Sequence, residues 1–197
     1  MEEARAAGAR RFVLDLRGNA GGELEQAVLA AGLFLDGGSV VYVREEAGGE
    51  RERVLSPAPE AFGASGRALV GEPLVVLVDG GSASSSEILA SALRDNGRAT
   101  LVGETTMGTG TVLAEFPLED GSSVLLGVAE WLTPEGDFIR ESGISPDIEV
   151  AVEEDGEALS PEQIDGMTAG EIAGRDAQLG AALRETGLRF DEPGSRR

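Results

Sequence analysis

One segment constrains the fold of this chain more than any other: five consecutive aliphatic residues, Leu74-Val75-Val76-Leu77-Val78, with no polar residue among them. Such a run is typical of a strand that is covered on both faces, as in a parallel sheet flanked by helices. A glycine turn at 79–81 ends the run, and apolar side chains then recur at helical spacing as far as Asn96-Gly97. This order of buried strand, turn and amphipathic helix predicts an α/β fold.

The other periodic segments fit the same fold class. An apolar run at 12–16 enters a glycine-rich loop at 17–22, and a helix is predicted at 23–35. The stretch 45–71 predicts surface loops around one short strand near Val54. Because early strands alternate with helices and a hairpin follows, we expect a mixed sheet with flanking helices. The remaining strands are predicted at 39–44, 100–103, 111–116 and 124–131, the last two joined by a turn signal at 119–121.

The composition changes after Val150. An acidic segment at 153–157 is followed by Ser160-Pro161, which is typical of a helix N-cap with proline at the first helical position. A second short helix is predicted at 176–186, and the last residues, 191–197, are expected to fray. We therefore expect one domain at 11–150, and an acidic linker with a helical tail at 151–197 that packs on this domain or on a partner.

The net charge narrows the possible partners. The formal charge is −20 and the pI is about 4.2, so nucleic acids and anionic membranes would repel this chain, and we expect neither as a partner. No cofactor is expected, and the absence of cysteine and histidine excludes disulfides and disfavours a zinc site. Residues 1–11 contain no apolar stretch, so the sequence as given predicts no signal peptide or membrane span and indicates no cellular location.

The basic residues restrict catalysis further. All 16 are arginine, which stays protonated in proteins and cannot accept a proton near neutral pH. Histidine, lysine and cysteine are absent, so the usual general bases and thiol nucleophiles are missing. Only carboxylates, Tyr42 and the terminal amine are left for that role.

Ser84 has a position that suits a nucleophile. It opens the helix after the buried strand, where its hydroxyl would be exposed at the sheet edge and the first helical amides could stabilise an oxyanion. The spacing of Ser84 and Glu87 also fits a capping box, in which each side chain bonds to the other residue's backbone amide. Taken alone, this motif favours the cap over the nucleophile.

Five motifs rich in glycine, serine and threonine follow one another along the chain. They are Leu14-Asp15-Leu16-Arg17-Gly18-Asn19-Ala20-Gly21-Gly22, Gly81-Ser82-Ala83-Ser84-Ser85-Ser86-Glu87-Ile88, Gly103-Glu104 with Gly108-Thr109-Gly110-Thr111-Val112, Thr133-Pro134-Glu135-Gly136 and Gly143-Ile144-Ser145-Pro146-Asp147. In this order they resemble the motifs of the tail-specific, or C-terminal processing, serine peptidases. The resemblance covers about residues 11–150, and five ordered motifs are far more specific than any one of them. It implies a catalytic domain of ClpP/crotonase-like architecture that cleaves apolar C-terminal tails of proteins.

The resemblance assigns roles to particular positions. The family's nucleophile maps onto Ser84. Its general-base lysine lies 25 residues later, at Thr109, and the glutamine that orients this lysine lies four residues further on, at Leu113. Gly21 and Gly22 match the glycine loop that helps to form the oxyanion hole, and they also suit a strand-to-helix turn with unusual backbone angles.

The resemblance implies that the base and its orienting residue are both replaced, by Thr109 and Leu113. A neutral lysine can take the serine proton, whereas a threonine hydroxyl has no basic form near neutral pH. Loss of a general base costs roughly two to four orders of magnitude in rate. We therefore expect a degenerate serine peptidase, a pseudoenzyme. It is expected to keep the surface that binds unfolded protein or peptide C-termini after losing catalytic activity.

Other functions stay open at this stage. A working peptidase could use a carboxylate base, although Glu87, Glu104 and Asp95 each suit a structural role. The fold of the family also resembles that of retinoid-binding modules, which leaves a non-catalytic binder of apolar ligands as an alternative. Family members are usually extracytoplasmic and capture tails with a PDZ domain. In the sequence as given, we expect no PDZ domain before residue 11. We expect either the second half of a longer protein or a stand-alone remnant, of undetermined oligomeric state.

Overall fold

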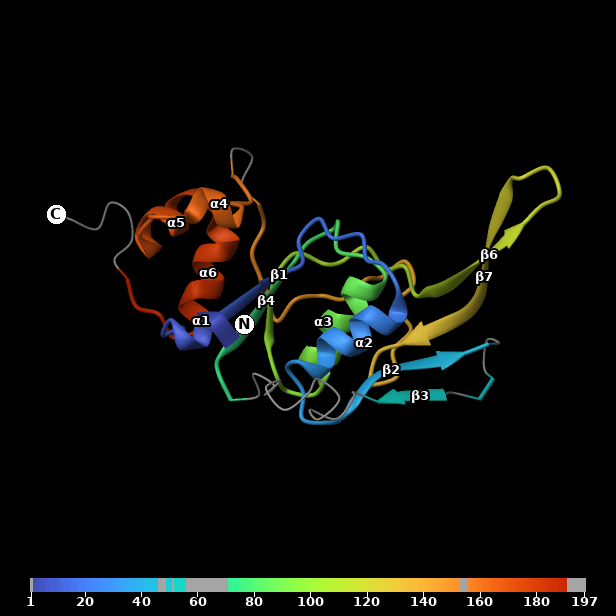
Figure 1. The fold of residues 1–197 in the computed structure, drawn as a ribbon. Coiled ribbons are helices and arrows are strands. Elements are labelled where there is room, and N and C mark those ends of the chain that lie inside the picture. Colours follow the sequence, from blue (N-terminus) through green and yellow to red (C-terminus); the bar gives the residue numbers. More distant parts are fainter. Residues whose placement is uncertain (1, 46–48, 51, 56–70, 153–155, 191–197) are drawn as a thin grey trace.

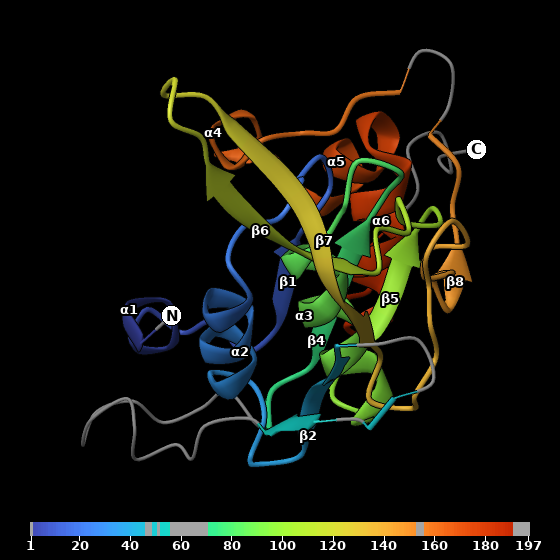
Figure 2. The same ribbon diagram turned by 90° about the vertical axis from the view of Figure 1, so that its right-hand side faces the viewer.

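Two four-stranded sheets organise the computed structural model, which describes residues 2–45, 49–50, 52–55, 71–152 and 156–190 (Figure 1). The first sheet is parallel throughout. Figure 2 shows its strands side by side in the order β1-β4-β5-β8. Their bounds are Phe12–Asp15 for β1, Leu74–Val78 for β4, Thr100–Gly103 for β5 and Ile148–Glu149 for β8.

The second sheet is antiparallel, with the order β3-β2-β7-β6. Its longest pairing joins β6 to β7 in the hairpin that the turn signal at 119–121 predicted. The α/β class is confirmed, and both parallel and antiparallel pairings are present. They are divided between two sheets, because β2 pairs with β3 and β7 instead of extending the parallel sheet. The bounds are Ser39–Arg44 for β2, Glu52–Leu55 for β3, Thr111–Pro117 for β6 and Ser123–Leu132 for β7.

The aliphatic strand β4 lies between two layers of helices. All five of its residues are buried, and side chains alternate between the two faces of a strand. Leu74, Val76 and Val78 pack in the same cluster as helices α2 (Leu24–Gly32) and α3 (Ser85–Asp95). Val75 and Leu77 pack in a second cluster, with residues from the C-terminal helices. The run without polar residues therefore has helices on both faces, as the sequence predicted.

The C-terminal helices cover the face of the parallel sheet opposite α2 and α3 (Figure 1). They are α4 (Pro161–Ile164), α5 (Ala169–Arg175) and α6 (Ala177–Glu185). Ser160 is the N-cap of α4 with proline at its first position, as predicted, and α6 confirms the helix expected at 176–186. The tail was expected to pack on the domain at 11–150 or on a partner, and in the structure it packs on the domain. Its buried apolar residues share one cluster with residues of β4 and β5, and they are Leu159, Ile172, Leu179 and Ala182.

Sequence periodicity does not predict three short elements: α1 (Glu2–Ala6), β8 and α5. Helix α1 has five residues and β8 has two, and α5 buries only Ile172, so none of them shows a regular row of apolar residues. Residues 56–70, 153–155 and 191–197, where further loop, linker and fraying were expected, lie outside the described residues. Within the described part of the chain, no helix is long and apolar enough to cross a bilayer.

The β6–β7 hairpin projects from the body at the end opposite the C-terminal helices (Figure 1). Its base is anchored, because Trp131 is buried and its amide donates to the carbonyl oxygen of Gly110 at 3.1 Å. Towards the tip, β7 becomes exposed. The exposed apolar residues of the hairpin are Leu113, Phe116, Leu118, Val124, Leu125, Leu126 and Val128.

Candidate active site

Ser84 lies at the N-cap of α3, where the turn after β4 enters the helix. Its backbone has φ 54° and ψ −120°, in the range of positive φ that glycine adopts most readily. Such a conformation costs of order 1–3 kcal/mol in a residue with a Cβ, and it persists only where the surrounding contacts enforce it. The Ser84 residue is half-buried.

The capping box predicted around Ser84 is present, although its serine half forms no full hydrogen bond. The Ser84 amide donates to Glu87 Oε2 at 2.9 Å, which is the glutamate half of the motif. The Ser84 side chain makes no cap hydrogen bond, and the Glu87 amide donates to the Ser84 carbonyl oxygen at 2.9 Å instead. The carboxylate of Glu87 therefore makes the hydrogen-bonded cap of the helix start, and the Ser84 side chain faces the Glu87 amide without a hydrogen bond.

Glu87 also fixes the loop that contains Thr109. The Glu87 residue has no exposed surface. Besides the Ser84 amide, its carboxylate accepts bonds from the Thr106 hydroxyl at 2.5 Å and the Gly108 amide at 2.7 Å. The Thr109 amide and hydroxyl add bonds at 3.0 and 2.8 Å. One buried carboxylate thus joins the loop at 106–109 to the first turn of α3.

Thr109, where the sequence predicts the family's lysine position, is hydrogen-bonded directly to Ser84. Its hydroxyl accepts a hydrogen bond from the Ser84 amide at 2.9 Å and donates one to Glu87 Oε2. With its proton held by the carboxylate, this oxygen serves as a bridge between two parts of the backbone. It has no basic form with which to deprotonate Ser84.

Leu113 lies further along β6, opposite Gly127, and is 60% exposed. A bulge between Val112 and Leu113 shifts the register of β6 at this point. The apolar side chain offers no donor or acceptor to orient a base at position 109. The structure therefore brings Thr109 to Ser84 and leaves Leu113 on the exposed hairpin.

The glycine loop lies directly against Ser84. Gly21 has φ 93°, and a Cβ at this position would lie 2.5 Å from the Ala83 carbonyl oxygen and 2.9 Å from Ser84 Cβ, so only glycine fits. The Gly21 amide donates to Asn19 Oδ1 at 2.9 Å. Among the described residues, the amides of Gly22 and Ser85 donate to no other group.

The other carboxylates considered as bases have structural partners. Asp95 lies at the opposite end of α3, about 16 Å away at 1.5 Å per residue, and pairs with Arg94 at 2.8 Å. Glu104 accepts a hydrogen bond from the Val152 amide at 3.2 Å. Glu87 is occupied by the five donors described above. Within the described ranges, no group of three or more carboxylates could hold a metal ion.

Residues that sequence reasoning missed hold the two loops together. Asp79 Oδ1 accepts bonds from the amides of Gly18 and Gly81, both at 2.9 Å, and so links the turn after β1 to the turn after β4. Ser82, buried, donates to the Leu16 carbonyl oxygen at 2.8 Å. The short-range signal was present in Asp79-Gly80-Gly81, where an aspartate side chain can bond to a backbone amide two residues on. The partner from the other loop carries no such signal.

The comparisons with known proteins fit this geometry. The model of peptidase family S41 matches residues 1–150. The chain belongs to peptidase family S41. It is 43% identical over 141 residues to the carboxy-terminal processing protease CtpA of Bacillus subtilis, covering 72% of this chain and 28% of that protein. It is 44% identical over 140 residues to the carboxyl-terminal-processing protease of Synechocystis, covering 71% and 31%.

A solved structure agrees with this S41 assignment. The photosystem II D1 C-terminal processing protease superposes with a TM-score of 0.64 at 37% identity, over 76% of this chain and 36% of that one. The resemblance to C-terminal processing serine peptidases is therefore confirmed, together with the α/β fold. The S41 chain spans about a third of the length of these relatives.

Proposed function

We propose that this S41 chain is a C-terminal processing peptidase-like domain that binds unfolded protein or peptide C-termini without cleaving them. The observation that carries the proposal is Thr109, which takes the place of the family's lysine and whose hydroxyl is bonded to Ser84 and Glu87. The full sequence contains no lysine, histidine or cysteine. Ser84 therefore has no neighbour of the usual kind to remove its proton.

Peptide binding does not need this base. The glycine loop packs on Ser84, and among the described residues the amides of Gly22 and Ser85 donate to no other group, which leaves them for a carbonyl oxygen of a bound peptide. An oxyanion-type pair of amides contributes binding independently of the general base. These features support retention of the peptide surface after loss of the dyad.

The decisive experiment restores the missing groups. In the double variant Thr109→Lys with Leu113→Gln, we expect hydrolysis of an unfolded protein with an apolar C-terminal tail to rise by roughly two to four orders of magnitude over the wild type. The same variant with Ser84→Ala is the matched control, in which this hydrolysis should disappear. Circular dichroism of each variant verifies that it is folded.

Two results would contradict the proposal. Wild-type cleavage that is lost in Ser84→Ala would mean that a carboxylate or another group activates the serine, and fluorophosphonate labelling of Ser84 across pH would then identify the titrating base. A wild-type chain that shows no affinity for a fluorescent peptide with an apolar C-terminus, measured by anisotropy, would exclude the binding role.

A further inference from the structure

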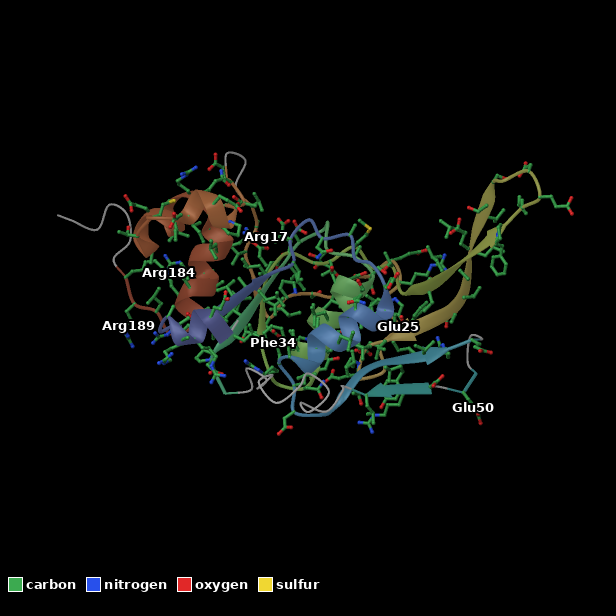
Figure 3. The ribbon with its side chains drawn as sticks, in the orientation of Figure 1. Arg17, Glu25, Phe34, Glu50, Arg184 and Arg189 are labelled. Carbon is green, nitrogen blue, oxygen red and sulfur yellow. The ribbon has the colours of Figure 1, made fainter. Side chains whose placement is uncertain are left out.

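Arg17 connects the glycine loop to the C-terminal helices. It lies two residues after the end of β1, and Figure 3 labels it between that strand and the C-terminal helices α4–α6. Its guanidinium donates to Asp176 through two parallel bonds, Nη1 to Oδ1 at 3.0 Å and Nη2 to Oδ2 at 2.9 Å. Gln178 Oε1 accepts a further bond at 3.1 Å, and Asp15 binds the other edge of the guanidinium.

This ion pair is buried on both sides. The side chains of Arg17 and Asp176 are 4% and 1% exposed. Burial by itself would lower the pKa of Arg17, but the bonds to Asp15 and Asp176 outweigh it and raise the pKa above its ordinary value. The two-bond geometry between a guanidinium and a carboxylate fixes the orientation of both groups.

Asp176 is held in place by the C-terminal segment itself. It is the N-cap of α6, where its Oδ1 accepts the Leu179 amide at 2.8 Å. Its Oδ2 accepts the Leu159 amide at 3.0 Å. The position of the carboxylate is therefore set by two points of the C-terminal segment, which present it to Arg17.

Arg17 is the first residue of the glycine-rich loop at 17–22. The next residues are bonded in turn: Gly18 to Asp79, and the Asn19 carbonyl oxygen to the Ala83 amide at 3.0 Å. Gly21 then packs on Ser84. A continuous series of contacts thus leads from the tail carboxylate to the nucleophile position.

We propose that Asp176 is a positioning residue that acts through Arg17, so that the C-terminal segment 156–190 sets the conformation of the glycine loop beside Ser84. This segment is then a working part of the site and not an appendage. A buried ion pair adds little net stability compared with apolar side chains of similar size. The effect of the intact pair is therefore expected mainly in the geometry of the loop, whereas removal of Arg17 alone also lowers stability because it leaves Asp176 buried without its partner.

The test measures loop order without requiring activity. Hydrogen exchange by mass spectrometry compares Arg17→Met with Arg44→Met, which removes a partly buried Arg44–Glu130 pair of 2.6 Å at the base of the hairpin. We expect the loop peptide at 17–23 to exchange at least about tenfold faster in Arg17→Met, relative to β4, and to be unchanged in Arg44→Met. A purely structural role would accelerate the loop and β4 by the same factor.

Two further variants keep the test decisive if one protein does not fold. Asp176→Asn retains an oxygen for the Leu179 amide but loses the charge, and Arg17→Lys keeps a charge without the two-bond geometry. Both should loosen the loop as Arg17→Met does. Unchanged relative exchange of the loop in the variants that fold would overturn the proposal.

Only one readout rests on the proposed function. Affinity for the apolar-tailed peptide should fall in Arg17→Met and persist in Arg44→Met. If the wild type binds no peptide while the loop responds to Arg17→Met, the proposed function fails and the positioning role stands. If the peptide binds equally to all variants and the loop does not respond, the positioning role fails alone.

Discussion

Glu87 shows how one side chain can determine the local shape of a site. Its carboxylate has no exposed surface and accepts bonds from the helix start and from three residues of the loop at 106–109. A neutral amide at this position would turn an NH₂ group towards donors that need an acceptor. The charge, and not only the size, of this residue holds the loop.

We expect Glu87→Gln to lower the free energy of unfolding by about 2–4 kcal/mol, because it leaves several buried donors unsatisfied. Urea denaturation followed by circular dichroism measures the change. Glu115→Gln, on the exposed part of β6, is the matched control and should have little effect. Equal stability of the two variants would show that the buried bonds of Glu87 contribute nothing.

Only some of the contacts around Ser84 could be predicted from the sequence. Ser84, Thr109 and the glycine pair could be located by motif and spacing, and the capping role of Glu87 by its position three residues after Ser84. The bond from the Ser84 amide to the Thr109 hydroxyl could not, since it depends on how a distant loop folds back. That loop requires Gly108, where a Cβ would lie 2.6 Å from the Gly143 amide nitrogen.

Strand β7 is exposed to solvent at one end and buried at the other. Its C-terminal end is buried beside β2, whereas its first six residues are exposed on the projecting hairpin. Strand β4, by contrast, is buried along its whole length. The two strands therefore differ in how much each apolar residue contributes to stability.

We expect Leu77→Ala in β4 to cost about 2–5 kcal/mol of unfolding free energy, because it leaves a cavity in the core. Leu125→Ala, at a position that is 64% exposed, should cost no more than about 0.5 kcal/mol. Thermal and urea unfolding of both variants measure the difference. A large loss in Leu125→Ala would mean that the hairpin is packed against something in solution.

The elements that the sequence predicted best are those with a long, regular pattern, such as β4, α3 and the β6–β7 hairpin. The division into two sheets was harder, because it depends on β2 pairing with β7, almost 90 residues away. The packing of the C-terminal helices depends on contacts such as those of Leu179 with the face of β4 that carries Val75 and Leu77. The periodicity of a single segment cannot predict such contacts.

The whole molecule carries a formal charge of −20, which disfavours the compact state through self-repulsion. Raising the salt concentration from about 10 mM to about 150 mM shortens the screening length from about 30 Å to about 8 Å. We expect the Tm to rise over this range, as measured by calorimetry at neutral pH. A Tm that falls or stays constant would indicate that specific surface ion pairs outweigh the net repulsion.

The same titration separates the buried pair from the surface charges. Because Arg17 and Asp176 are almost inaccessible to solvent, ions screen them weakly. Arg17→Met should therefore shift the Tm by a similar amount at both salt concentrations. A shift that vanishes at the higher concentration would place the Arg17 interaction at the surface.

The anchored base of the hairpin has a practical consequence for experiments on this chain. Trp131 is the single tryptophan in the sequence, it is buried, and its amide is bonded to Gly110, the neighbour of Thr109. Intrinsic fluorescence excited at indole wavelengths thus originates from one point, next to the loop that contains Thr109. A shift in emission when a peptide is added would report a rearrangement at that point, with no label attached.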